Sequence, residues 1–172
     1  MTRSVYKLTF SAVMAALTVA CLYLASAFPT GQVGIVAVAS LFTIAAVIEA
    51  GIKHAALLYA VCAILSFLMI PLKGVAIIYT LFFGYYPIVK SFAERMKKPL
   101  YSWILKEAVF LAALFVVWFL FRNLIFTGRT LDISPLIIFP ACIVAFTLYD
   151  IGLTRLIAYY LYRLSPKLKR KR

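Results

Sequence analysis

Acidic residues, histidine and cysteine are all scarce in this sequence. Its 172 residues include five Asp or Glu, one His and three Cys. The single histidine, His54, stands beside a lysine with no recognisable nucleophile and base around it, and the motifs HExxH and GxSxG are absent. Cys21, Cys62 and Cys142 are isolated in apolar stretches, where a free thiol packs as a small hydrophobic group. We therefore expect no enzyme, no metal site and no cofactor.

Charged residues of either sign make up only 13% of the chain, whereas 66% of it is hydrophobic and the mean hydropathy is +1.04. Soluble proteins are about 45–50% apolar, and a chain of this length could not bury such an excess. The composition predicts an integral membrane protein with one domain, residues 1–172. The net charge of +13 would suit nucleic acid in a soluble protein, but the basic residues lie between and after apolar runs. We therefore expect no nucleic-acid partner.

Six apolar runs are separated by segments with turn chemistry. A membrane-spanning helix needs about 20 apolar residues, and strict two-residue alternation, which barrel strands require, is absent. The sequence thus predicts an all-α integral membrane protein, a compact bundle of about six transmembrane helices. The predicted spans are 7–28, 34–50, 54–70, 75–89, 102–126 and 135–161.

The basic residues predict the orientation, because lysine and arginine accumulate in cytoplasmic loops. One set of loops and ends carries most of them, including a basic tail at 163–172, while the opposite loops hold only Lys73, Arg122 and Arg129. Both termini are therefore predicted to be cytoplasmic. The basic tail could also bind anionic lipid headgroups of the bilayer.

The stretch "FFGYYPIVK", residues 82–90, ends the fourth predicted span on its cytoplasmic side. Pro87 lacks an amide hydrogen and should kink the helix, and Gly84 permits the close approach of a neighbour. Tyr85 and Tyr86 would lie at the depth of the membrane interface. The stretch is either an aromatic belt with a helix stop, or a bent docking surface for a partner formed by Tyr85, Tyr86 and Pro87.

Five ionisable residues are the candidates for a charge network at membrane depth, and all five lie in the cytoplasmic half: Glu49, Lys106, Glu107, Asp150 and Arg155. Charges at membrane depth are costly and often functional. This intramembrane charge network either aligns the helices by mutual neutralisation, relays ions, or forms a socket for a partner. A relay across the membrane would need acids in the outer half, where only Asp132 occurs, in a loop. This argues against a standalone proton-coupled transporter.

The outer half offers a different set of polar residues as ligand-binding candidates: Gln32, Lys73, Tyr79, Arg122 and Asn123. Arg122 and Asn123 lie about one turn before the outer end of the fifth span. The arginine either extends to the lipid headgroups or belongs to a small pocket for a polar or anionic solute.

The first span carries Ala12, Ala16 and Ala20 at intervals of four residues, a smooth stripe that another helix can approach closely. With its length, six spans and cytoplasmic ends, the chain resembles the substrate-binding S component of energy-coupling-factor (ECF) vitamin transporters of bacterial cytoplasmic membranes. The resemblance implies that the stripe faces a membrane coupling subunit, which works with two cytoplasmic ATPases. It also implies that a small polar solute is captured from outside near the predicted ligand-binding residues.

The chain is also similar in size and plan to the small membrane subunit of the bacterial rod-shape complex, which has no catalytic residues and acts by binding partners. That resemblance implies a non-catalytic membrane scaffold of a cell-envelope or cell-shape complex. The inner charges and the Tyr-Tyr-Pro helix end would then be partner sockets, and no solute pocket would be needed.

Overall fold

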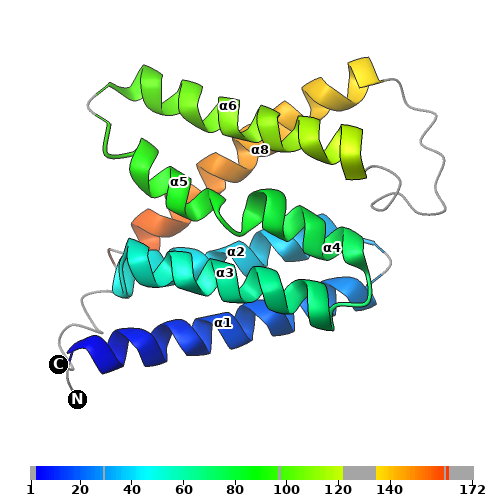
Figure 1. The fold of residues 1–172 in the computed structure, drawn as a ribbon. Coiled ribbons are helices and arrows are strands. Elements are labelled where there is room, and N and C mark those ends of the chain that lie inside the picture. The colour runs from blue at the N-terminus through cyan, green and yellow to red at the C-terminus, as the bar shows by residue number, and fades with distance from the viewer. Residues whose placement is uncertain (1–2, 29, 97, 122–134, 161, 163–172) are drawn as a thin grey trace. The chain divides into compact units, whose positions relative to one another are not determined.

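A computed structural model describes residues 3–28, 30–96, 98–121, 135–160 and 162, and within this part of the chain every regular element is helical (Figure 1). Among these residues, six helical stretches are long and apolar enough to cross a membrane. The predicted all-α class is thereby confirmed, and the number of these helices agrees with the six predicted spans. By its internal contacts the chain divides into two compact units, Met1–Thr130 and Leu131–Arg172.

The first three helices form the base of the first unit. They are α1 (Arg3–Ala27), α2 (Gln32–Glu49) and α3 (Ile52–Met69). α1 packs along both α2 and α3 (Figure 1). Gly31 (φ 78°) and Gly51 (φ 92°) connect them, and both adopt positive φ angles that side chains with a Cβ atom disfavour. The connections can therefore be short, and consecutive helices run antiparallel.

The fourth span is broken into three consecutive pieces: α4 (Lys73–Ile78), the π-helix η1 (Tyr79–Phe83) and α5 (Tyr86–Ala93). It is longer than the predicted 75–89, and the break falls immediately before the predicted kink at Pro87. α2 contacts both α4 and α5, and α5 also contacts α6 (Pro99–Val116). A second π-helix, η2 (Val117–Phe121), continues α6. The last predicted residues of the fifth span, 122–126, lie outside the described residues.

The second unit is represented by one long helix, α8 (Pro135–Tyr159), which contains Pro140. It begins at the predicted position and ends two residues before the predicted 161. The basic tail at 163–172 lies outside the described part of the chain.

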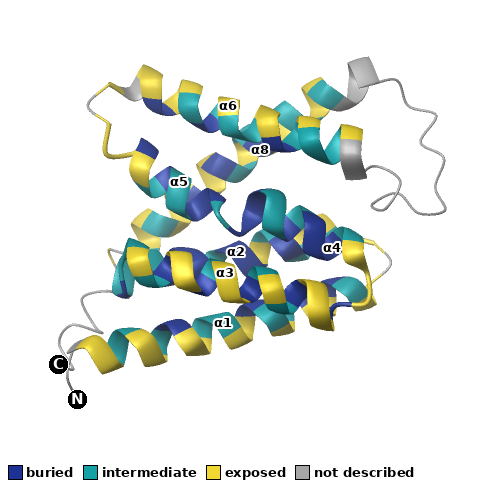
Figure 2. Ribbon diagram, in the orientation of Figure 1, coloured by how far each residue is buried: buried dark blue, intermediate teal, exposed yellow. Residues whose placement is uncertain are grey.

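Apolar side chains lie on the surface as well as in the core. Buried positions of α1, α2 and α3 include small and polar residues: Thr18, Ala25, Ala39, Ser40, Thr43, Ala46, Ala55, Cys62 and Ser66. Large apolar side chains are exposed along the same helices and along α6 and α8 (Figure 2), for example Leu68 at 74% and Leu148 at 66%. Small residues let membrane helices pack closely, and apolar surface is tolerated where lipid replaces water. This distribution is compatible with a multi-pass membrane protein.

Candidate functional site

An open apolar groove lies between α1 and α3 and contains the predicted alanine stripe. Its volume is ≈ 810 Å³, and its walls are Ala12, Ala15, Ala16, Val19, Ala20, Tyr23 and Leu24 from α1 with Val61, Leu65 and Met69 from α3. Ala12, Ala16 and Ala20 are all exposed. The alanines place only methyl groups on this face, so the backbone of α1 stays accessible to a neighbour.

The opposite face of α1 makes the contacts inside the first unit. Ser11, Thr18, Leu22 and Ala25 are buried there, at intervals of seven, four and three residues that keep them on one side of the helix. α1 therefore has two faces suited to close packing. One is occupied by α2 and α3, and the other lines the groove.

A π-turn in the fourth span changes the hydrogen bonds of its backbone. The amide of Gly84 donates to the carbonyl of Tyr79 at 2.7 Å, five residues back. In an unbroken α-helix it would donate to Thr80, four residues back. π-turns inside α-helices are rare and occur frequently at functional sites. Pro87 contributes to the break, because it has no amide hydrogen for the carbonyl of Phe83.

Tyr59 of α3 fills the place that the π-turn opens. Its hydroxyl donates to the carbonyl of Thr80 at 2.9 Å, which replaces the amide of Gly84 as a hydrogen-bond donor to that carbonyl. A bond of this kind stabilises a fold by about 0.5–1.5 kcal/mol. We call Tyr59 and the π-turn it contacts, residues 79–84, the tyrosine wedge.

Gly84 is required by the position of the Tyr59 ring. A Cβ atom at residue 84 would lie 2.7 Å from Cδ2 of Tyr59 and 3.0 Å from Cε1 of Tyr79, closer than any side chain tolerates. The ring of Tyr59 also contacts the rings of Tyr79, with centroids 6.4 Å apart, and of Tyr85, with centroids 6.0 Å apart and an edge-on geometry. The close approach predicted for Gly84 is therefore confirmed, with Tyr59 as the neighbour.

Buried hydroxyl groups gather beside the wedge. Within the described residues, the hydroxyls of Thr43, Tyr79 and Thr80 are buried and have no well-aligned hydrogen bond. The Tyr79 hydroxyl lies close to Thr43 and to the thiol of Cys62. An unsatisfied buried hydroxyl costs about 1–3 kcal/mol. The structure thus brings the Tyr79 hydroxyl, Thr43 and the Cys62 thiol together inside the first unit.

The predicted ligand-binding residues have different surroundings. Gln32 donates from Nε2 to the carbonyl of Phe28 at 3.1 Å. Lys73 donates from Nζ to the carbonyls of Phe67 at 2.6 Å and Ile70 at 3.1 Å, so it caps the end of α3. Tyr79 is fully buried. Arg122 and Asn123 lie outside the described residues. Gln32 and Lys73 share one end of the first unit, where α2 and α4 begin.

The predicted partner surface at the end of the fourth span is largely internal. Tyr86 is fully buried and contacts the ring of Phe82, with centroids 4.9 Å apart. Pro87 is also buried, and Tyr85 is partly exposed. Of these three residues, Tyr85 alone keeps ring surface available, and that ring already contacts Tyr59.

The five predicted intramembrane charges divide between the two units. Glu49, Lys106 and Glu107 belong to the first unit; Lys106 is buried, with its ammonium group 5.2 Å from the ring centroid of Trp103. In the second unit Asp150 is buried and Arg155 is exposed. Asp150 and Thr154 share one face of α8, where the Thr154 hydroxyl donates to the Asp150 carbonyl at 2.9 Å.

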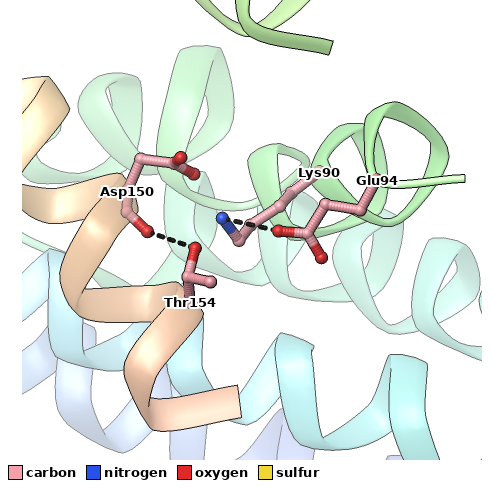
Figure 3. Close-up of polar contacts among 4 residues, drawn as sticks. All are labelled: Lys90, Glu94, Asp150 and Thr154. Carbon is pink, nitrogen blue, oxygen red and sulfur yellow. Dashed lines mark hydrogen bonds and ion pairs between the residues drawn. The ribbon is translucent and has the colours of Figure 1, made fainter. Parts of the chain in front are cut away.

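One ion pair was not predicted. Lys90 Nζ lies 2.9 Å from Glu94 Oε1, and Lys90 is 1% exposed whereas Glu94 is 39% exposed (Figure 3). The i, i+4 spacing of opposite charges on α5 was the available signal. Lys90 was instead assigned to the cytoplasmic end by the distribution of positive charge. Lys90 lies in the last turn of α5, which extends to Ala93.

Comparisons with protein-family models, with curated proteins and with solved structures found no match to this chain.

Proposed function

We propose that this chain is the membrane-embedded substrate-binding subunit of an ECF-type, ATP-driven uptake transporter. It would lie in the bacterial cytoplasmic membrane with both termini in the cytoplasm. The observation that carries the proposal is the groove between α1 and α3. Ala12, Ala16 and Ala20 line it and are exposed, so the stripe is available to a second protein.

The chemistry of the groove favours a helical partner. Lipid tails are as apolar as leucine, so membrane helices associate through close packing rather than through the hydrophobic effect. A stripe of alanines beside a hollow of ≈ 810 Å³ lets large side chains of another helix insert. On this proposal the partner is the membrane coupling subunit, which in turn binds two cytoplasmic ATPases.

The solute would be small and polar and would enter at the end where α2 and α4 begin. Gln32 and Lys73 lie at that end, and Arg122 and Asn123 complete the proposed set. The amine of Lys73 now donates to two backbone carbonyls. Binding an anionic group there would require it to exchange those acceptors for the solute. Uptake would follow from reorientation of the subunit within the complex, driven by ATP hydrolysis in the partner ATPases.

A second function, a non-catalytic scaffold subunit of a cell-envelope or cell-shape complex, is favoured by a different observation. The polar groups of Gln32 and Lys73 already bond to the chain's own backbone, and Tyr79 is fully buried. A scaffold needs the groove but no solute site. The two functions therefore share the same interface and differ in the partner.

The test is a gentle detergent pull-down of the tagged full chain from its own host, read by mass spectrometry. It compares the unmodified chain with the double variant Ala12→Leu, Ala16→Leu. The matched control is Val5→Leu, Val13→Leu, which adds bulk to exposed positions of the same helix outside the groove. We expect the stripe variant to lose its partners and the control to keep them.

The identity of the partners decides between the two functions. A pair of ATPases with a helical membrane subunit supports the transporter, and cell-wall synthesis or shape proteins support the scaffold. Equal capture by the stripe variant would contradict the assignment of the groove. Recovery of neither group of partners would overturn both functions.

A further inference from the structure

The tyrosine wedge contains two alternative hydrogen-bond donors for one backbone carbonyl of the fourth span. One backbone carbonyl, that of Thr80, has two competing donors. The first is the amide of Gly84, which an α-helix would supply. The second is the hydroxyl of Tyr59, which supplies the bond in this structure at 2.9 Å. The Gly84 amide goes instead to Tyr79 at 2.7 Å.

We propose that Tyr59 is a latch that holds the fourth span in its π-helical register, and that release of its hydroxyl returns the span to an α-helical register. The proposal stands apart from the transporter and scaffold functions, because it depends only on contacts inside the first unit. The latch is supplied by α3, and the segment it controls is η1, so two helices must keep their packing for the π-turn to persist.

Three buried hydroxyls bear on the balance between the π-helical and the α-helical register. Those of Thr43, Tyr79 and Thr80 lack well-aligned hydrogen bonds within the described residues. Two of them belong to η1 itself, and Thr43 belongs to the neighbouring α2. A register that leaves buried polar groups unsatisfied is raised in free energy, which brings it closer to the α-helical alternative. Such closeness is the requirement for a two-state element.

Gly84 allows the latch to close. The ring of Tyr59 lies where a Cβ atom of residue 84 would be, so any larger residue would push the ring, and with it the hydroxyl, away from Thr80. The rings of Tyr79 and Tyr85 contact Tyr59 from two further positions. The aromatic contacts keep the ring of Tyr59 in place, and its hydroxyl favours the π-helical register by bonding to Thr80.

Release would change the relation between α4 and α5. A π-turn accommodates one extra residue, and one residue corresponds to about 100° of rotation and about 1.5 Å of rise. Returning to an α register would therefore turn α4 by about 100° relative to α5 and move Tyr79 from its present buried position. Helix shifts of about 1–2 Å are an established means of switching between conformations.

The test uses nuclear magnetic resonance on the full chain in lipid nanodiscs, with 15N-labelled glycine. The chain has seven glycines, and the Gly84 signal is identified by its loss in Gly84→Ala. The informative variant is Tyr59→Phe, which removes the hydroxyl but keeps the ring and its magnetic effect on neighbours. The control is Tyr23→Phe, since Tyr23 is exposed on α1.

We expect the Gly84 amide signal to shift, or to split into two exchanging signals, in Tyr59→Phe, while the signals of Gly34 and Gly51 stay in place. Tyr23→Phe should change none of the three. An unchanged Gly84 signal in folded Tyr59→Phe would overturn the proposal.

If Tyr59→Phe does not fold, relaxation-dispersion measurements on the unmodified chain take its place. Millisecond exchange at Gly84 and its absence at Gly34 would support the latch. Absence of exchange at both glycines would overturn it.

Discussion

The groove on α1 and the tyrosine wedge both depend on small residues that leave room for a neighbour. The room is filled in the wedge and open in the groove. At Gly84 the neighbour is present, because the ring of Tyr59 occupies the space of the missing side chain. Along Ala12, Ala16 and Ala20 the space is an open groove. Small residues alone therefore do not indicate whether a helix face packs inside the fold or is available to another protein. The difference lies in what the other helices place opposite them.

The largest effect that distinguishes the two regions is expected for matched enlargements, Gly84→Leu and Ala16→Leu. Gly84→Leu should lower the free energy of unfolding by about 1–3 kcal/mol or more, since overpacking forces side chains and backbone to shift. Ala16→Leu adds its side chain to an open groove and should change stability by less than about 0.5 kcal/mol. Thermal or denaturant unfolding in detergent measures both.

Gly34→Ala provides the control for the glycine itself. Gly34 lies within α2, and a Cβ atom there would meet nothing within 4 Å. Replacing a helical glycine by alanine without a clash stabilises by roughly 0.5–1 kcal/mol. A loss of stability in Gly34→Ala comparable to that in Gly84→Leu would show that the clash with Tyr59 is not the cause.

A smaller effect should separate two buried threonines near the wedge, Thr43 and Thr18. Thr43→Val removes a hydroxyl without a well-aligned hydrogen bond, so we expect stability to be unchanged or raised by about 1 kcal/mol. Thr18→Val removes a hydroxyl that donates to the carbonyl of Met14 at 2.8 Å, and should lower stability by about 0.5–1.5 kcal/mol. Unfolding midpoints of the two variants, measured side by side, check the order. A greater loss in Thr43→Val would mean that its hydroxyl is satisfied.

The smallest effect is expected at the ion pair of α5. Glu94→Gln removes the charge that faces Lys90 at 2.9 Å, but Glu94 is 39% exposed. Water and salt screen such a pair, so the loss should be about 0–1 kcal/mol. The measurement is the unfolding midpoint at low and at high salt, and the difference from the unmodified chain should shrink as salt increases. A large loss that salt does not reduce would indicate that Glu94 is effectively shielded from solvent.

The sequence predicted the positions of the helices better than the contacts between them. Apolar runs broken by Gly31, Gly51 and Pro71 located the first three helices to within a few residues, because these breakers act locally. The π-turn could not be predicted in this way. It depends on Tyr59, which is 25 residues before Gly84 in the sequence and reaches it only after α3 and the fourth span have packed together.

The candidate sites show the same limit. The spacing of Ala12, Ala16 and Ala20 was sufficient to define one face of α1, and that face lines the groove. The roles of Gln32, Lys73 and Tyr79 depended on which atoms would surround them, and spacing carries no such information. Lys73 in particular was predicted to bind a solute, and nothing in the sequence indicated that its amine would also cap the end of α3.

The cap made by Lys73 has a mechanical consequence. It fastens the first residue of α4 to the last turn of α3, and the other end of α4 continues into the turn that Tyr59 holds. Both ends of α4 are therefore held by hydrogen bonds to the same neighbouring helix, α3. A rotation of α4 would therefore disturb the hydrogen bonds at both of its ends, those of Lys73 and that of Tyr59.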